Sequence, residues 1–205
     1  NAMVGGYVEH VLHVTDCALK IKKLWEDGGA MINFTDEELI FAAMHHDLGK
    51  VGDLDDDYYI PQDSEWHRKN RGEIFKHNPA LQYMTVTDRA IFILNHFGIK
   101  MSQWEYIGLK LTDGMYEEAN KGYYISYMPH KQLRSNIAHI LHQADMMAAR
   151  IEFEKEYFPK FTESKEDNFK LQTKKSTKKT SVKNKALSDI PKNDNLKGVI
   201  DKFFE

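Results

Sequence analysis

Phe41-Ala42-Ala43-Met44-His45-His46-Asp47-Leu48-Gly49-Lys50 is an apolar helical run that ends in a His-Asp pair, a glycine and a lysine. An imidazole nitrogen beside a carboxylate offers two kinds of ligand atom that borderline divalent cations accept. A bound metal would explain why polar groups stand at the end of a core helix. The alternative is a capped helix end with exposed polar residues, so the pair needs support from elsewhere in the chain.

The residues before this run predict where its helix begins and which histidine faces inward. Thr35-Asp36-Glu37-Glu38 has the form of a capping box, and Gly49 is a helix stop. Leu39 and His46 would share the buried side of the helix. Successive helical residues are turned by about 100°, so His45 and His46 cannot both face one pocket. We expect His46 to face the core and His45 to face elsewhere.

An earlier helix is predicted over about residues 4–27, because apolar residues recur at three- and four-residue steps. These residues are Val14, Ala18, Ile21 and Leu24. His10 lies one turn before the first of them and extends the buried stripe with a polar group, either as a ligand or as a satisfied core histidine. His13 and Cys17 follow at one-turn steps. They could be neighbours of the site, but we interpret both as residues at the edge of the core.

The last long helix is predicted from about Gln132 to Tyr157. Its buried stripe consists of Leu133, Ile137, Ile140, Leu141, Ala144, Ala148 and Ile151. Asp145 falls within this stripe, where an ionised and unpaired carboxylate would cost at least a few kcal/mol. A cation or several hydrogen-bond donors must therefore meet it, which makes Asp145 the second indication of a metal site.

Three shorter helices are predicted between these long ones. They run from Ser64 toward Phe75, from Thr87 to His96, and from a capping box at Ser102 to about Thr112. Residues 51–63 are rich in Asp and Tyr and lack periodicity, so we interpret them as a loop that could serve as a lid. The predicted fold class is all-α, a bundle of about six main helices with a C-terminal tail.

Length and composition favour one domain with a tail: the chain has 205 residues, of which 41% are apolar. No apolar run approaches the roughly 20 residues that cross a bilayer, and there is no signal-like segment. The single Cys17 cannot form an internal disulfide, so we expect a cytoplasmic protein without membrane association. A net charge of −3 argues against a wholly basic nucleic-acid binder, although lysines gather near the C-terminus, so nucleic-acid binding stays open.

The predicted domains are residues 4–160, a Lys-rich linker at 161–194 and a short amphipathic helix at 195–205. The helix places its apolar residues on one side, and these are Leu196, Val199, Ile200, Phe203 and Phe204. Such a short helix needs a surface to bury against. Its spacing resembles the sliding-clamp-binding peptide of replication and repair proteins, although Lys197 occupies the usual glutamine position. The alternative is docking onto its own domain or a second copy.

Three pieces of the chain together resemble the HD-domain metal-dependent phosphohydrolase superfamily. They are His10-Val11-Leu12-His13-Val14-Thr15-Asp16-Cys17-Ala18, Ala42-Ala43-Met44-His45-His46-Asp47-Leu48-Gly49-Lys50 and His142-Gln143-Ala144-Asp145. In order, they match the family's first histidine, its His-Asp pair and its final aspartate, over roughly residues 4–155. The resemblance implies an HD-domain helical bundle in which one divalent metal is bound by His10, His46, Asp47 and Asp145.

The resemblance also implies a reaction, which is phosphoester hydrolysis by a metal-activated water. Asp47 is the candidate for steering that water, and Lys50 for neutralising a phosphate oxygen; the alternative for Lys50 is an ordinary cation at a helix C-terminus. Two imidazoles and two carboxylates suit manganese, iron, cobalt, nickel, zinc or magnesium. Some relatives hold a second metal through extra histidines, for which His67, His77 and His96 are candidates, but our choice is one ion.

The substrate is less well defined than the reaction, because the family includes nucleotidases, triphosphohydrolases and cyclic-nucleotide phosphodiesterases. We expect a small phosphorylated substrate, a nucleotide, because aromatic and basic residues alternate in two loops; the alternative is that the rings simply pack. The loop residues are Tyr58, Tyr59, Trp66, Tyr116, Lys121, Tyr123 and Tyr124. A second class of function is a metal-stabilised scaffold that binds a protein partner through its tail, and Lys50 favours the enzyme over it.

Overall fold

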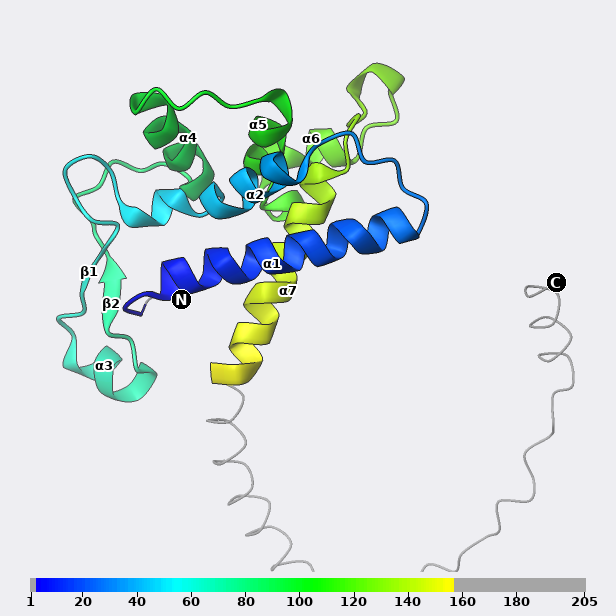
Figure 1. Ribbon diagram of the computed structural model, residues 1–205. Coiled ribbons are helices and arrows are strands. Elements are labelled where there is room, and N and C mark those ends of the chain that lie inside the picture. The colour runs from blue at the N-terminus through cyan, green and yellow to red at the C-terminus, as the bar shows by residue number, and fades with distance from the viewer. Residues whose placement is uncertain (1–2, 157–205) are drawn as a thin grey trace, which may run out of the picture. The chain divides into compact units, whose positions relative to one another are not determined.

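Helices form nearly all the regular structure of residues 3–156, the part of the chain that the computed structural model describes (Figure 1). These residues contain seven α-helices and one two-stranded sheet. In order, the elements are α1 (Gly6–Asp27), α2 (Asp36–His45), β1 (Tyr59–Pro61), α3 (Glu65–Arg71), β2 (Phe75–His77), α4 (Val86–His96), α5 (Gln103–Lys110), α6 (Lys121–Tyr124) and α7 (Ile137–Glu156). The mostly helical architecture agrees with the prediction, and the sheet is an exception to all-α.

The core lies where α1 crosses α7 and where α2 packs beside both (Figure 1). Most of the predicted apolar residues face inward, but Leu24, predicted in the buried stripe of the first helix, is 70% exposed near the end of α1. The buried residues of this hydrophobic core are Val14, Cys17, Ala18, Phe34, Leu39, Ala42, Ala43, Ile137, Ile140, Leu141, Ala144 and Ala148. Small alanines on α2 and α7 let the helix axes approach closely, and this crossing brings the polar positions of three helices together.

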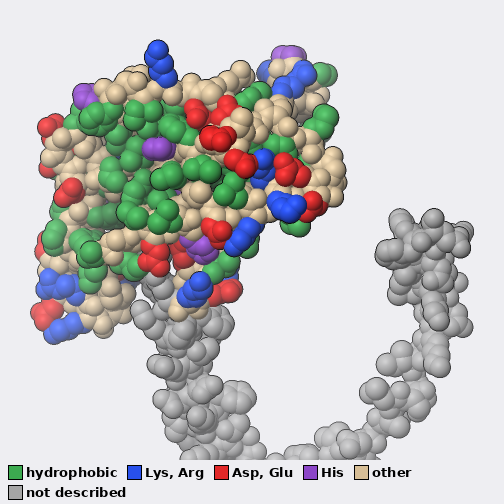
Figure 2. Space-filling model, viewed as in Figure 1, with side chains coloured by type: hydrophobic (Ala, Val, Ile, Leu, Met, Phe, Trp, Pro, Cys, Tyr) green, Lys and Arg blue, Asp and Glu red, His purple; other side chains and the backbone are tan. Residues whose placement is uncertain are grey.

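The outer side of α1 changes character along its length. Val8 and Leu12 are exposed in its first half, whereas the exposed Lys23 in its second half pairs with Asp27 across 3.4 Å. Figure 2 shows hydrophobic side chains over the middle of this face and charged side chains gathered toward the C-terminal end of α1. The polar end stays solvated, and the inner side supplies the core.

Side-chain caps stand at the starts of α2, α3, α4 and α5. The predicted capping boxes at Thr35 and Ser102 are confirmed, with reciprocal side-chain and backbone hydrogen bonds. Ser64 caps α3 as predicted, but Gly72, with a φ of 67°, ends that helix after two turns. Thr85 caps α4 two residues before the predicted Thr87. In addition, α7 begins at Ile137, later than predicted.

The ribbon formed by β1 and β2 corrects two predictions. Residues 59–61 belong to the expected loop, and Phe75 was expected at the end of a helix, yet the two segments pair antiparallel with Tyr59 opposite His77 and Pro61 opposite Phe75. Strands of three residues are too short to produce a period in the sequence. Their pairing arises because α3 turns the chain back, and Figure 1 shows the ribbon beside the start of α1.

Several predictions concern residues outside the described part. The Lys-rich linker at 161–194, the amphipathic helix at 195–205 and the predicted end of the last helix at Tyr157 all lie beyond Glu156. The proposed domain boundaries therefore stay predictions. Among residues 3–156, no helix has both the length and the apolar character needed to cross a membrane.

Candidate metal centre

Four side chains predicted as metal ligands converge in the structure, although they come from distant parts of the sequence. The ligand atoms of His10, His46 and Asp47 lie within 4.8 Å of one another, and all three residues are buried. Asp145 joins them from α7: its Oδ1 lies 3.2 Å from His10 Nε2 and 3.7 Å from His46 Nε2. The side chain of Asp145 is 26% exposed, so the cluster reaches the surface on its side.

The end of α2 aims two successive residues at this cluster. The helix ends at His45, and Asp47 leaves helical geometry with φ −101° and ψ 9° before a short 3₁₀ turn at Leu48–Val51. This unwinding lets His46 and Asp47 face the same point. His45 turns away as predicted, with its Nδ1 atom 2.7 Å from the carbonyl oxygen of Phe41.

Hydrogen bonds fix the orientation of both histidine rings. His46 Nδ1 lies 2.7 Å from the carbonyl oxygen of Ala43, so this nitrogen must donate, and Nε2 is left with its lone pair. That Nε2 atom is buried and has no hydrogen-bond partner among the described residues. A buried polar atom without a partner is costly, and a cation at this point would satisfy it.

Glu152 orients the second ring and was missed by the sequence reasoning. Its carboxylate oxygens lie 3.0 and 3.1 Å from His10 Nδ1, which leaves His10 Nε2 free to face the cluster. The same carboxylate lies 2.9 Å from Nδ1 of His13, so His13 is a neighbour of the site and not merely a residue at the core edge. A carboxylate behind a ligating imidazole is a common outer layer of metal sites. Glu152 follows Asp145 by two helical turns and so lies on the same side of the helix. This spacing is the sequence feature that could have identified Glu152 as a residue of the site.

The electrostatics of the cluster favour a cation. Burial tends to raise the pKa of Asp145, but the nearby imidazoles of His10 and His46 outweigh it and hold that pKa below its usual range. Burial tends to lower the pKa of His46, but its interactions with Asp145 and Asp47 outweigh burial, so the net pKa is raised. Both shifts reflect carboxylates that stay ionised and draw positive charge toward the cluster.

Lys50 stands beside the cluster and lines a cavity of about 120 Å³. Its Nζ atom lies 2.5 Å from Asp47 Oδ2. Burial tends to lower the pKa of Lys50, but Asp47 raises it further, so the ammonium stays charged. The cavity is lined by Met3, Tyr7, His10, Asp47, Lys50, Tyr59 and Phe75. The geometry thus places a cation, three aromatic rings and two cluster residues around one opening.

Tyr7 was not predicted as part of the site, yet it closes one side of this cavity. Its hydroxyl donates to the carbonyl oxygen of Met44 at 3.2 Å. Burial, together with the charge of Asp47, raises the pKa of Tyr7 to about 12, so the phenol stays neutral at physiological pH. It offers a hydroxyl dipole, not a charge, to whatever occupies the cavity.

The other predicted histidines lie apart from this cluster. His67 is on α3, where its Nδ1 atom is 2.7 Å from Ser64 Oγ. His77 is on β2, and His96 is at the end of α4 beside Phe97. Within residues 3–156, none of the three belongs to a group of three or more potential metal ligands. They do not extend the cluster to a second ion.

The predicted substrate loops separate into different surroundings. Tyr59 lines the cavity beside Lys50, whereas the Tyr58 ring lies 5.2 Å below the guanidinium of Arg89. Trp66 is exposed and sits under Arg71. The rings of the second loop line other cavities: Tyr116 and Tyr124 occur together in one, and Tyr123 in another. Only Tyr59, of the predicted aromatic residues, lines the cavity at the cluster.

Comparison of the chain with family models, with curated proteins and with solved structures finds no match. What the site can do is therefore argued from its own donors. Two imidazole nitrogens and two carboxylates form a set that binds a borderline or hard divalent cation. The buried group of His10, His46 and Asp47 could bind such an ion, and the adjoining lysine would attract an anionic ligand.

Proposed function

We propose that the protein is a metal-dependent phosphohydrolase with an HD-domain fold. The observation that carries this proposal is the buried, unpartnered Nε2 atom of His46, which faces a second imidazole and two carboxylates. The order of these residues along the chain matches the resemblance described above. His10, His46, Asp47 and Asp145 would hold one divalent cation.

The proposed chemistry assigns one contribution to the metal and the others to side chains. When bound, the cation supplies Lewis acidity, which polarises a phosphoryl oxygen and lowers the pKa of a water molecule. Asp47 accepts a hydrogen bond from the attacking water and orients it toward phosphorus. Glu152 holds the His10 ring in the tautomer whose Nε2 atom carries a lone pair.

Lys50 is the proposed phosphate-binding cation. Its ammonium lies against Asp47 at the cavity edge, so it can neutralise a phosphate oxygen next to the attacking water. This pairing also keeps the amine positioned before substrate binds. A lysine used only to stabilise a helix end would not need to line the cavity.

The proposed substrate is a small phosphoester, a nucleotide in particular. A cavity of about 120 Å³ accommodates the phosphate group, and the rest of the substrate must extend outward. Tyr59 and Phe75, on paired strands of the ribbon, provide aromatic surface in that direction. A base or sugar can rest there while the phosphate stays next to Lys50.

The test is phosphate release from a panel of nucleotides and phosphomonoesters, each assayed with manganese, iron, cobalt, nickel, zinc and magnesium. We expect metal-dependent release that is lost in His46→Ala and in Asp145→Ala. His45→Ala is the matched control, because it removes a neighbouring imidazole that faces away from the cluster. Release from folded His46→Ala at the parent rate, or no release from the folded parent with any metal, would refute the proposal.

A further inference from the structure

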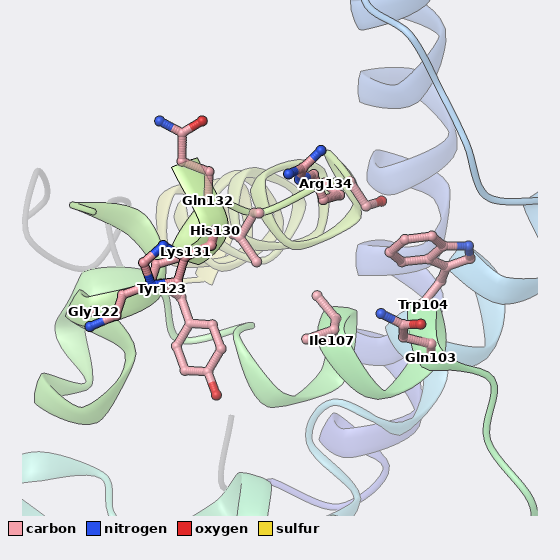
Figure 3. A pocket seen from close by; sticks show the side chains of 11 residues that line it. Gln103, Trp104, Ile107, Gly122, Tyr123, His130, Lys131, Gln132 and Arg134 are labelled. Atoms are coloured by element: carbon pink, nitrogen blue, oxygen red, sulfur yellow. The ribbon is translucent and has the colours of Figure 1, made fainter. Parts of the chain in front are cut away.

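A second, larger cavity lies away from the metal cluster. It has a volume of about 410 Å³ and shares no lining residue with the cavity beside Lys50. The residues around it are Gln103, Trp104, Ile107, Gly122, Tyr123, His130, Lys131, Gln132, Leu133, Arg134 and Ser135 (Figure 3). It reaches Ser135, just before α7 begins, whereas Asp145 lies about 12 Å further along that helix at 1.5 Å per residue. The two cavities are therefore separate.

The lining of this cavity carries positive charge without a counterpart. It contains Lys131, Arg134 and His130 but no Asp or Glu. Within residues 3–156, neither Lys131 nor Arg134 forms an ion pair. The chain has no acidic residue between Glu118 and Asp145, although its net charge is −3. Two cations without an ion-pair partner in the described part of the chain, both in one concave site, favour an anionic ligand.

Two aromatic rings flank the same space. Figure 3 shows Tyr123 and Trp104 on either side of Ile107, with Lys131 on the Tyr123 side and Arg134 above Ile107. Trp104 packs against the hydrophobic core, so its ring is held in place before any ligand arrives. Tyr123 is partly exposed and offers its ring to the cavity. Aromatic rings beside cations are the elements that bind planar, charged molecules.

We propose that this cavity binds a nucleoside phosphate as a second ligand, distinct from the substrate of the metal centre. The base stacks on Tyr123 and Trp104, and the phosphates contact Lys131 and Arg134. The start of α7 at Ile137 adds the positive end of a helix dipole on the same side. The volume falls within the range of about 300 to 1,000 Å³ that small-molecule sites occupy.

The experiment measures binding of ATP, adenosine and inorganic triphosphate to the full chain by titration calorimetry, with a chelator present to keep the metal centre empty of divalent ions. Lys131→Gln combined with Arg134→Gln removes the cavity charges. Lys20→Gln combined with Lys23→Gln is the matched control, because both lysines are exposed on α1. The Lys-rich segment near the C-terminus is present in every variant, so its contribution is common to all.

We expect ATP to bind the parent and the control alike, and at least about tenfold more weakly to the cavity variant. Tyr123→Ala should weaken ATP by about tenfold through loss of stacking. Adenosine and triphosphate should each bind more weakly than ATP, because each lacks half of the recognised group. Equal loss in the control variant would overturn the site, and triphosphate binding as tightly as ATP would overturn its assignment to a nucleoside.

Discussion

Glu152→Gln tests whether the carboxylate behind His10 is an outer layer of a metal site. The substitution keeps the shape of the side chain and removes its negative charge. In the parent, the carboxylate lies 3.0 Å from His10 Nδ1 and 2.9 Å from His13 Nδ1. A glutamine has one acceptor oxygen, and its amide group cannot accept from the second ring. The His10 ring therefore loses both its counter-charge and a fixed tautomer.

The expected magnitude follows from these contacts. Loss of an outer-layer carboxylate weakens metal binding by about 10- to 100-fold, which is about 1.4 to 2.7 kcal/mol. With metal in excess, the stabilisation that the ion adds to the folded protein falls by the same amount. Without metal, the variant should still unfold cooperatively, because Glu152 lies at the edge of the crossing between α1 and α7 and not among its packed apolar residues.

The assay is competition for manganese against a chromophoric chelator, paired with thermal unfolding with and without metal. Glu154→Gln is the matched control, since Glu154 lies on the same helix and pairs with the exposed Arg150 at 2.9 Å. We expect the control to bind metal as the parent does. Unchanged affinity in Glu152→Gln, or the same loss in both variants, would refute the assigned role.

Three further predictions concern Gly49, Lys50 and His139. Gly49→Ala should lower the free energy of unfolding by about 3 kcal/mol or more, because its Cβ would stand 2.1 Å from the carbonyl oxygen of Val86; urea unfolding measures this, and Gly28→Ala, whose Cβ would meet nothing closer than 3.4 Å, should change little. Lys50→Met should reduce kcat/KM for phosphate release by at least about tenfold while metal affinity is retained, and a parallel loss of metal binding in the competition assay would contradict a role in phosphate recognition. Burial, reinforced by a neighbouring histidine, lowers the pKa of His139, so the unfolded chain takes up a proton more readily and stability falls as pH drops through the usual imidazole range. His139→Gln should flatten that slope between about pH 7 and about pH 5 in denaturant titrations, and an unchanged slope would count against it.

Local signals predicted the helices that position the cluster. The capping boxes at Thr35 and Ser102 mark helix starts because their hydrogen bonds close within four residues, so the sequence contains the whole interaction. His10 and Asp145 were placed inward because each interrupts an apolar stripe of helical period. Their meeting required the stripes of α1 and α7 to pack against each other, which they do.

Glu152 shows where such reasoning ends. Glu152 lies in the polar C-terminal end of α7, where Glu154 has similar sequence neighbours. Glu152 is nevertheless buried, whereas Glu154 is exposed. Only the crossing of α1 over α7 distinguishes the two glutamates, because it puts His10 and His13 next to one of them. The ribbon of β1 and β2 was not predicted for a related reason. Its pairing depends on α3, which reverses the chain direction, and a strand of three residues has no sequence pattern that identifies its partner strand.

The stability of the ribbon formed by β1 and β2 is coupled to ligand binding in the cavity beside Lys50. Tyr59 and Phe75 line the cavity beside Lys50, yet they stand on two paired strands of three residues each. An isolated two-stranded ribbon is at best marginally stable in water. A ligand that rests on these rings therefore contributes part of the free energy that keeps the strands paired, and amide exchange in β1 and β2 should slow when the cavity is filled. By reciprocity, any change that destabilises the pairing of β1 and β2 lowers the affinity of the cavity for its ligand by the same factor. Ligand binding and strand pairing therefore stabilise each other.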